Sequence, residues 1–113
     1  MKSGIMAVAV AAALALSGCG GEKTLAEKCD DKVRAYVEGE YAIKPLLKSP
    51  SEADFSGVTK TKMVKEGQCK WSMVGYVDAK NSFNATTRVP WVAVVEFRES
   101  TDAWHPLSAK LVE

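Results

Sequence analysis

An unbroken run of twelve apolar residues near the start of the chain most limits what the remainder can fold into. Residues 5–16 are IMAVAVAAALAL, with Lys2 before them and Ser17 and Gly18 after them. A membrane-spanning helix needs about 20 such residues, whereas the apolar core of a secretory signal peptide needs about 7–15, between a positive charge and small residues. The run therefore predicts a signal peptide over residues 1–18 and not a membrane-spanning helix.

The residues at the end of this segment, Leu16, Ser17, Gly18 and Cys19, form a second feature. They resemble the lipobox of bacterial lipoproteins, in which a hydrophobic residue and two small residues precede a cysteine. The resemblance implies that the Cys19 thiol receives a diacylglyceryl group, that cleavage occurs before Cys19, and that the new amine is acylated, for example with palmitate. Residues 19–23 would then be a lipidated tether, because two or three acyl chains suffice for stable anchoring. The alternative is an ordinary secreted protein cleaved near Gly18 or Gly20.

The same resemblance implies a location in the cell envelope, with the lipid anchor as the contact with the membrane. In lipoproteins of Gram-negative cells, Asp after the lipidated cysteine commonly signals retention in the inner membrane, and Gly20 stands at that position here. If the cell is Gram-negative, the expected location is the periplasmic face of the outer membrane.

The charges of the remaining chain, about 94 residues long, balance one another. The sequence has 15 Lys and Arg and 14 Asp and Glu residues, so removal of Lys2 leaves a net charge of zero. A nucleic-acid-binding domain would show a basic patch or a high pI, and a domain held on anionic lipids would show a basic cluster. The composition fits neither class, and the length predicts one domain over residues 24–113.

Two further cysteines, Cys29 and Cys69, are left once Cys19 is assigned to the lipid. An even pair in an oxidising compartment predicts a disulfide. The bridge would close a loop of about 40 residues and contribute about 4 kcal/mol in the chain-entropy model. The alternatives are two buried free thiols or a metal site, although this spacing and one distant histidine do not resemble a zinc site. We expect no metal and no cofactor.

An amphipathic helix is predicted from residue 24 to about residue 44. Thr24 and Glu27 have the spacing of a capping box. Apolar residues recur every four positions on one face, with two tyrosines beside them: Leu25, Cys29, Val33 and Val37, flanked by Tyr36 and Tyr41. Pro45 is expected to end or kink this helix, because proline lacks the amide donor.

After Pro50 the apolar residues follow a period of two, which predicts strands. The first is expected over residues 58–65, and a turn follows at residues 66–68. The second begins at Cys69 and the third covers residues 87–97, where Pro90 indicates an edge or a bulge. A fourth strand is marked by Leu107, Ala109 and Leu111.

Together these patterns predict an α+β fold, with the N-terminal amphipathic helix packed on a three- to four-stranded antiparallel meander sheet. Short connections between consecutive strands favour the antiparallel meander. The sheet has one apolar face, and the helix is the only predicted element that could cover it. A bridge between Cys29 and Cys69 would join helix and sheet at that interface.

Two longer motifs carry a further resemblance. Residues 47–55 are LKSPSEADF and residues 75–88 are GYVDAKNSFNATTR. They resemble a widespread, uncharacterised small bacterial domain with the motifs LKSPSxAxF and GYVDAxNSFxAxxR, and the likeness covers roughly residues 44–112. Asn84 stands where that domain usually has Gly, and Lys80 where it usually has Gln. Asn tolerates positive φ better than other non-glycine residues, so the loop conformation is retained. The resemblance implies a fold, with a helix packed against an antiparallel sheet. It does not assign any activity to the chain.

The loop between the second and third strands, over residues 78–88, is the strongest candidate for a binding site, because loops on a rigid sheet commonly carry function. Its candidate residues are Tyr76, Asp78, Asn81, Ser82, Phe83, Asn84 and Arg88. The structural alternative is that Asp78, Asn81 and Asn84 bond the backbone of their own turn. In that case Phe83 packs on the sheet edge and Arg88 pairs with Asp78.

No residue pattern indicates catalysis. His105 is the single histidine, and the chain has neither a nucleophile motif nor a glycine-rich phosphate loop. We therefore predict a non-enzymatic module that binds or scaffolds another envelope component, with an envelope protein as partner. The alternative is a small envelope hydrolase or transferase that uses Asp78, Arg88 or His105.

Overall fold

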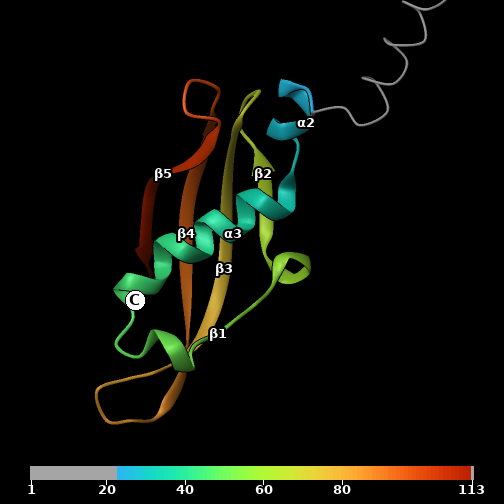
Figure 1. Cartoon of the computed structure of the whole chain (residues 1–113). Helices are drawn as coiled ribbons and strands as arrows, with labels where there is room; N and C mark the ends of the chain where they lie inside the picture. The colour runs from blue at the N-terminus through green and yellow to red at the C-terminus, as the bar shows by residue number, and fades with distance from the viewer. Residues whose placement is uncertain (1–22, 113) are drawn as a thin grey trace, which may run out of the picture.

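The computed structural model describes residues 23–112, where two helices precede an antiparallel sheet (Figure 1). The elements in chain order are helices α2 (Leu25–Cys29) and α3 (Lys32–Ile43), the 3-10 turns η1 (Lys44–Leu46) and η2 (Pro50–Glu52), strand β1 (Asp54–Phe55), turn η3 (Val58–Lys60), and strands β2 (Lys62–Lys65), β3 (Lys70–Lys80), β4 (Thr86–Arg98) and β5 (Ala103–Leu111). The α+β class with an antiparallel sheet is confirmed, and the sheet has five strands instead of three or four. The predicted signal peptide and Cys19 lie outside the described residues.

The N-terminal helix begins as predicted but is interrupted after one turn. The Thr24 side chain accepts from the Glu27 amide at 3.2 Å, and the Glu27 carboxylate accepts from the Thr24 amide at 2.8 Å, which completes the capping box. Helix α2 nevertheless ends at Cys29, and the Asp31 side chain caps α3 by accepting from the Arg34 amide. Asp bonds nearby backbone amides and so favours a new N-terminus over the interior of a helix. The prediction of one continuous helix is wrong.

The interruption changes which residues of α3 are buried. Val33, expected on the apolar face, is 54% exposed, and Tyr41 is 60% exposed. The buried residues of α3 are Ala35, Tyr36, Gly39 and Ile43. This stripe keeps helical spacing but is rotated from the predicted one, because α3 has its own start. Pro45 acts as expected, since the α-helix ends at Ile43 and continues only as the 3-10 turn η1.

The disulfide between Cys29 and Cys69 is present and joins the end of α2 to the start of β3, with the two Cα atoms 4.5 Å apart. The Trp71 indole nitrogen donates to the Cys29 carbonyl at 2.9 Å. Neither free thiols nor a metal site at these cysteines agrees with this bond. The bridge therefore links α2 covalently to the sheet.

The first predicted strand is shorter than expected, and a small strand precedes it. Within the expected residues 58–65, only β2 is extended, after the turn η3. Thr61 is buried and donates to the Gly57 carbonyl at 2.6 Å, and this bond closes the turn. β1, which the sequence patterns did not predict, pairs with β3 through Asp54 opposite Asp78.

The long hairpin of β3 and β4 forms the centre of the sheet, which runs β1–β3–β4–β5 with β2 also paired to β3. The predicted alternation is confirmed, and the buried face carries Met73, Val77, Ala79, Trp91, Ala93, Val95 and Phe97. The early part of β4 is an edge, as Pro90 indicated, since β5 pairs only from Trp91 opposite Leu111 onwards.

Strand β5 contains a bulge that the sequence pattern missed. Val94 lies opposite Ser108 and Val95 opposite Pro106, which leaves Leu107 as the extra residue. Leu107, one of the residues that marked this strand in the sequence, is 42% exposed. A bulge places one additional residue in its strand and breaks the alternation there. Ala109, two residues further on, is half-buried and packs against the core.

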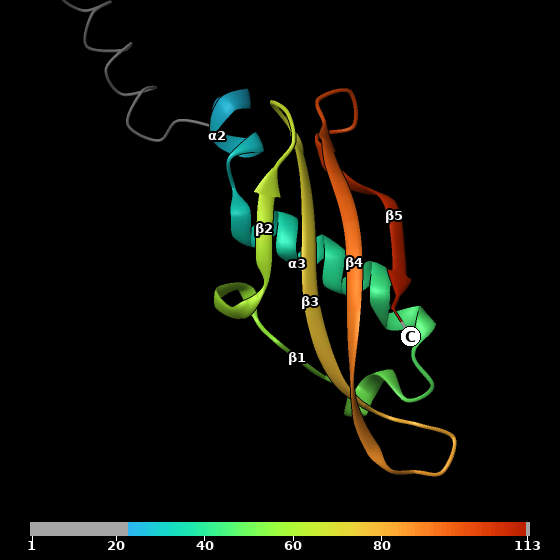
Figure 2. The same cartoon turned by 180° about the vertical axis from the view of Figure 1, so that it is seen from behind.

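Helix α3 crosses one face of the sheet diagonally, as both views show (Figure 1, Figure 2). Trp91 is fully buried at the centre of this interface. Its ring lies 6.5 Å from that of Tyr36 on α3 and 6.1 Å from that of Phe55 on β1, measured between centroids. Within residues 23–112, no helix covers the opposite face (Figure 2).

Candidate functional site

The candidate loop, expected over residues 78–88, is limited to residues 81–85, because β3 extends to Lys80 and β4 begins at Thr86. It joins the two strands at the end of the hairpin away from α2 (Figure 1, Figure 2). The eleven residues of β3 separate this loop from the disulfide. At about 3.3 Å per residue this corresponds to roughly 36 Å. A surface formed by the loop is therefore distant from the helix end of the domain.

Hydrogen bonds centred on Asn81 give the loop its shape. The Asn81 carboxamide oxygen accepts from the Phe83 amide at 2.8 Å and from the Ala85 amide at 3.1 Å. The Asn81 amide donates to the Ala85 carbonyl, and the Asn84 amide donates to the Asn81 carbonyl, both at 2.9 Å. Asn84 has a φ of 62°, the left-handed conformation expected of it. The loop thus has a defined conformation without long-range packing.

Arg88 and Asp78 form the predicted pair across the hairpin. Arg88 donates from Nε to Oδ1 at 2.8 Å and from Nη2 to Oδ2 at 3.0 Å. The guanidinium also lies over the Tyr76 ring, 4.0 Å from its centroid, in a cation–π contact. Hydrogen bonds from Arg88 lower the pKa of Asp78, and the Asp78 carboxylate raises the pKa of Arg88. The positive charge of Arg88 is consequently balanced by the Asp78 carboxylate within the domain.

Phe83 does not pack on the sheet edge, and that prediction is wrong. Its side chain is 88% exposed. The Asn81 hydrogen bonds close the turn at its base, so Phe83 extends from the tip. Next to it, Lys48 donates to the Ser82 carbonyl at 3.4 Å. The prediction that Asp78 and Asn84 bond the turn backbone through their side chains is also wrong, because Asp78 pairs with Arg88 and Asn84 contributes its amide.

The residues named for a hydrolase or transferase are not brought together. His105 lies near the start of β5 opposite Glu96, and its Nε2 is 2.7 Å from the Thr101 hydroxyl. Arg88 lies eight residues before Glu96 on β4, which corresponds to roughly 26 Å of strand. His105 therefore cannot act on the same bond as Asp78 and Arg88.

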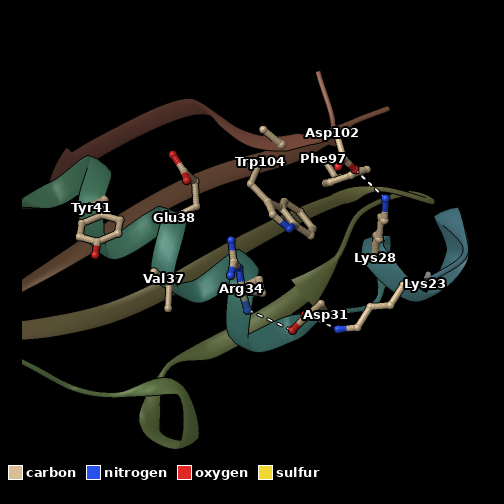
Figure 3. A pocket seen from close by; sticks show the side chains of 11 residues that line it. Lys23, Lys28, Asp31, Arg34, Val37, Glu38, Tyr41, Phe97, Asp102 and Trp104 are labelled. Atoms are coloured by element: carbon tan, nitrogen blue, oxygen red, sulfur yellow. Dashed lines mark hydrogen bonds and ion pairs between the residues drawn. The ribbon is translucent and has the colours of Figure 1, made fainter. Parts of the chain in front are cut away.

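A groove of about 410 Å³ that the sequence analysis did not find lies between the helices and the β4–β5 hairpin (Figure 3). Figure 3 shows Arg34 and Glu38 of α3 beside Trp104 of β5. The charged residues that line the groove have both signs: Lys23, Lys28 and Arg34, and Asp31, Glu38 and Asp102. Two pairs are already bonded, Lys28 to Asp102 and Lys23 to Asp31. No local sequence motif predicts this groove, because its residues come together only where α3 crosses the sheet.

Among residues 23–112, no group of three or more His, Cys, Asp or Glu side chains is arranged to hold a metal ion. None of the helices described in this part of the chain is long and apolar enough to span a membrane. Comparisons with family models, with curated proteins and with solved structures found no match for this chain. The likeness of residues 47–55 and 75–88 to a bacterial domain stays a prediction.

Proposed function

We propose that the chain is a lipid-anchored protein of the cell envelope, and that its helix-on-sheet domain binds another envelope protein without catalysing a reaction. The lipobox supports the anchor: Cys19 directly follows the apolar run and two small residues. The anchored end would be the membrane contact, on the periplasmic face of the outer membrane if the cell is Gram-negative.

The exposure of Phe83 is the observation that most supports a binding role. A phenylalanine that is 88% exposed on a loop with its own hydrogen bonds has little conformational entropy to lose on binding. Large aromatic anchors of this kind dominate the binding energy of protein interfaces. The loop also lies at the end of the sheet away from α2, so it would face away from the membrane to which Cys19 is attached (Figure 1).

Crosslinking in the native envelope tests the binding role. A photoreactive amino acid replaces Phe83, and in a matched control it replaces Tyr41, an exposed aromatic residue on α3. We expect a discrete crosslinked protein from position 83 only. Equal or absent crosslinking at both positions would contradict the proposed function.

Membrane fractionation of a Cys19→Ala variant tests the anchor separately. We expect the variant to leave the membrane fraction or to accumulate at the precursor size. A variant that stays membrane-bound at the mature size would show that Cys19 is not the lipidated residue.

A further inference from the structure

The free side of β4 next to the candidate loop is a second feature of this region. β4 has 13 residues, but β5 pairs with it only from Trp91 onwards. The Val112 amide donates to the Pro90 carbonyl at 2.8 Å beyond the last paired residue, Leu111. Residues 86–90 therefore have β3 on one side and, within residues 23–112, no strand on the other. We call this stretch the open edge.

The backbone of the open edge has hydrogen-bonding groups that no described strand pairs with. Bonding direction alternates along a strand of an antiparallel sheet. The Pro90 carbonyl points towards β5, so the amides and carbonyls of Arg88 and Thr86 point to the same side. Among residues 23–112 they have no strand partner there. An unpaired edge of this kind is a template for another strand.

A groove of about 630 Å³ runs along the open edge. It is lined by Asn81, Thr87, Arg88, Val89, Pro90 and Val112. Val89, Pro90 and Val112 supply apolar walls for the side chains of an added strand. The five residues of the edge span roughly 17 Å, which accommodates a strand of four or five residues.

The charges beside the open edge indicate the chemistry of the partner. Lys80 lies opposite Thr86 at the end of the hairpin, and Lys48 lies against the loop. Neither forms an ion pair with a described residue. A second copy of this chain would offer the same two lysines and no matching carboxylate on its own open edge, whose residues are Thr86, Thr87, Arg88, Val89 and Pro90. An acidic segment from a different protein would complement them.

We propose that an extended apolar segment with an acidic residue, from another envelope protein, adds to the open edge as a strand in line with β5. The backbone of Thr86 and Arg88 bonds the segment, Val89 and Val112 contact its apolar side chains, and Phe83 contacts the protein that carries it. This inference rests on the proposed function and specifies its mode of recognition.

Selection of peptides tests this mode. The full chain, purified in detergent micelles, is used to select from a phage library of random ten-residue peptides. We expect enrichment of a sequence that alternates apolar residues with at least one Asp or Glu. Thr86→Pro removes an outward amide without removing a bond to β3, and should weaken the selected peptide about tenfold through the lost hydrogen bond and the ring's steric block. Thr86→Val, which keeps the amide, should bind like the wild type.

A second variant covers the outcome in which Thr86→Pro does not fold. Val112→Glu places a negative charge in the groove at a side chain that is already 42% exposed. Val112→Glu should weaken binding of the acidic peptide at least as strongly as Thr86→Pro does. The melting temperature of this variant should equal that of the wild type.

Three outcomes would overturn the inference. The first is that no peptide is enriched, and the second is that folded Thr86→Pro and Val112→Glu variants bind the selected peptide as tightly as the wild type does. The third is a wild-type dimer that either variant dissociates. The proposed function would still stand in each case if position 83 crosslinks a protein in the envelope. Loss of that crosslink as well would remove both.

Discussion

At the helix end of the sheet, Cys29 is bonded to Cys69, and Lys28 pairs with Asp102 from seventy-four residues away. At the opposite end, residues 81–85 take their shape from hydrogen bonds between residues no more than four positions apart, and Lys48 adds one bond to the Ser82 carbonyl. The helix end therefore loses its order when distant segments separate, whereas the loop keeps its conformation as long as the hairpin exists. Such local order suits a binding loop, because Phe83 stays exposed without cost to the core.

Removal of the disulfide should have the largest effect, and should break the helix end first. Cys29→Ser with Cys69→Ser opens a loop of 40 residues and should cost about 4 kcal/mol of unfolding free energy. For a domain of this size the melting temperature should fall by more than about 15 °C. Thermal unfolding followed by circular dichroism measures the change, and the reduced wild type is the control. The prediction would be contradicted if both thiols of the unreduced wild type react with an alkylating reagent and the double variant melts at the same temperature as the wild type.

Gly75→Ala should have the next largest effect, at the centre of the sheet between the two ends. A Cβ at this position would lie 2.7 Å from Cζ2 of the buried Trp91 ring and 3.0 Å from the Ser56 hydroxyl. Because the Trp91 ring cannot move aside, we expect a loss of about 2–3 kcal/mol in urea unfolding. Gly67→Ala is the matched control, since a Cβ there has no atom within 4 Å. Equal stability of the two variants would show that the interface around Trp91 is loosely packed.

Arg88→Gln should have a larger effect on the pKa of Asp78 than on the free energy of unfolding. Arg88 holds the pKa of Asp78 below its ordinary value, chiefly through their hydrogen bonds. A carboxyl with a lowered pKa stabilises the fold above its unfolded pKa of about 3.9, and this contribution is lost as pH falls through the lowered value. We expect the pKa of Asp78 to rise in Arg88→Gln when followed by NMR. Arg98→Gln, which removes the partner of Glu96, should leave the titration of Asp78 unchanged.

Phe83→Ala should have the smallest effect on stability. The ring is 88% exposed, so the free energy of unfolding should change by less than about 0.5 kcal/mol. Phe55→Ala, at a ring packed on Trp91, should cost about 2 kcal/mol in the same urea experiment. A loss above about 1 kcal/mol for Phe83→Ala would mean that the ring packs on the domain in solution, and would remove the contrast between the two ends.

Several elements could be predicted because their signals are local. Thr24 and Glu27 form the capping box, Pro45 marks the end of α3, and the alternation of β3 and β4 identifies their buried face. Others could not be predicted, because their cause is distant. The Leu107 bulge depends on how β5 fits against β4, and β1 is extended because Asp54 and Phe55 pair with β3.

In the candidate site, the sequence by itself determined the Asp78–Arg88 pair and the left-handed Asn84. Both follow from residues within one hairpin, where register and turn chemistry decide the contacts. Tertiary structure alone decided the rotated face of α3 and the open edge of β4. These depend on where one element ends against another, and such ends are set by the sum of contacts across the domain.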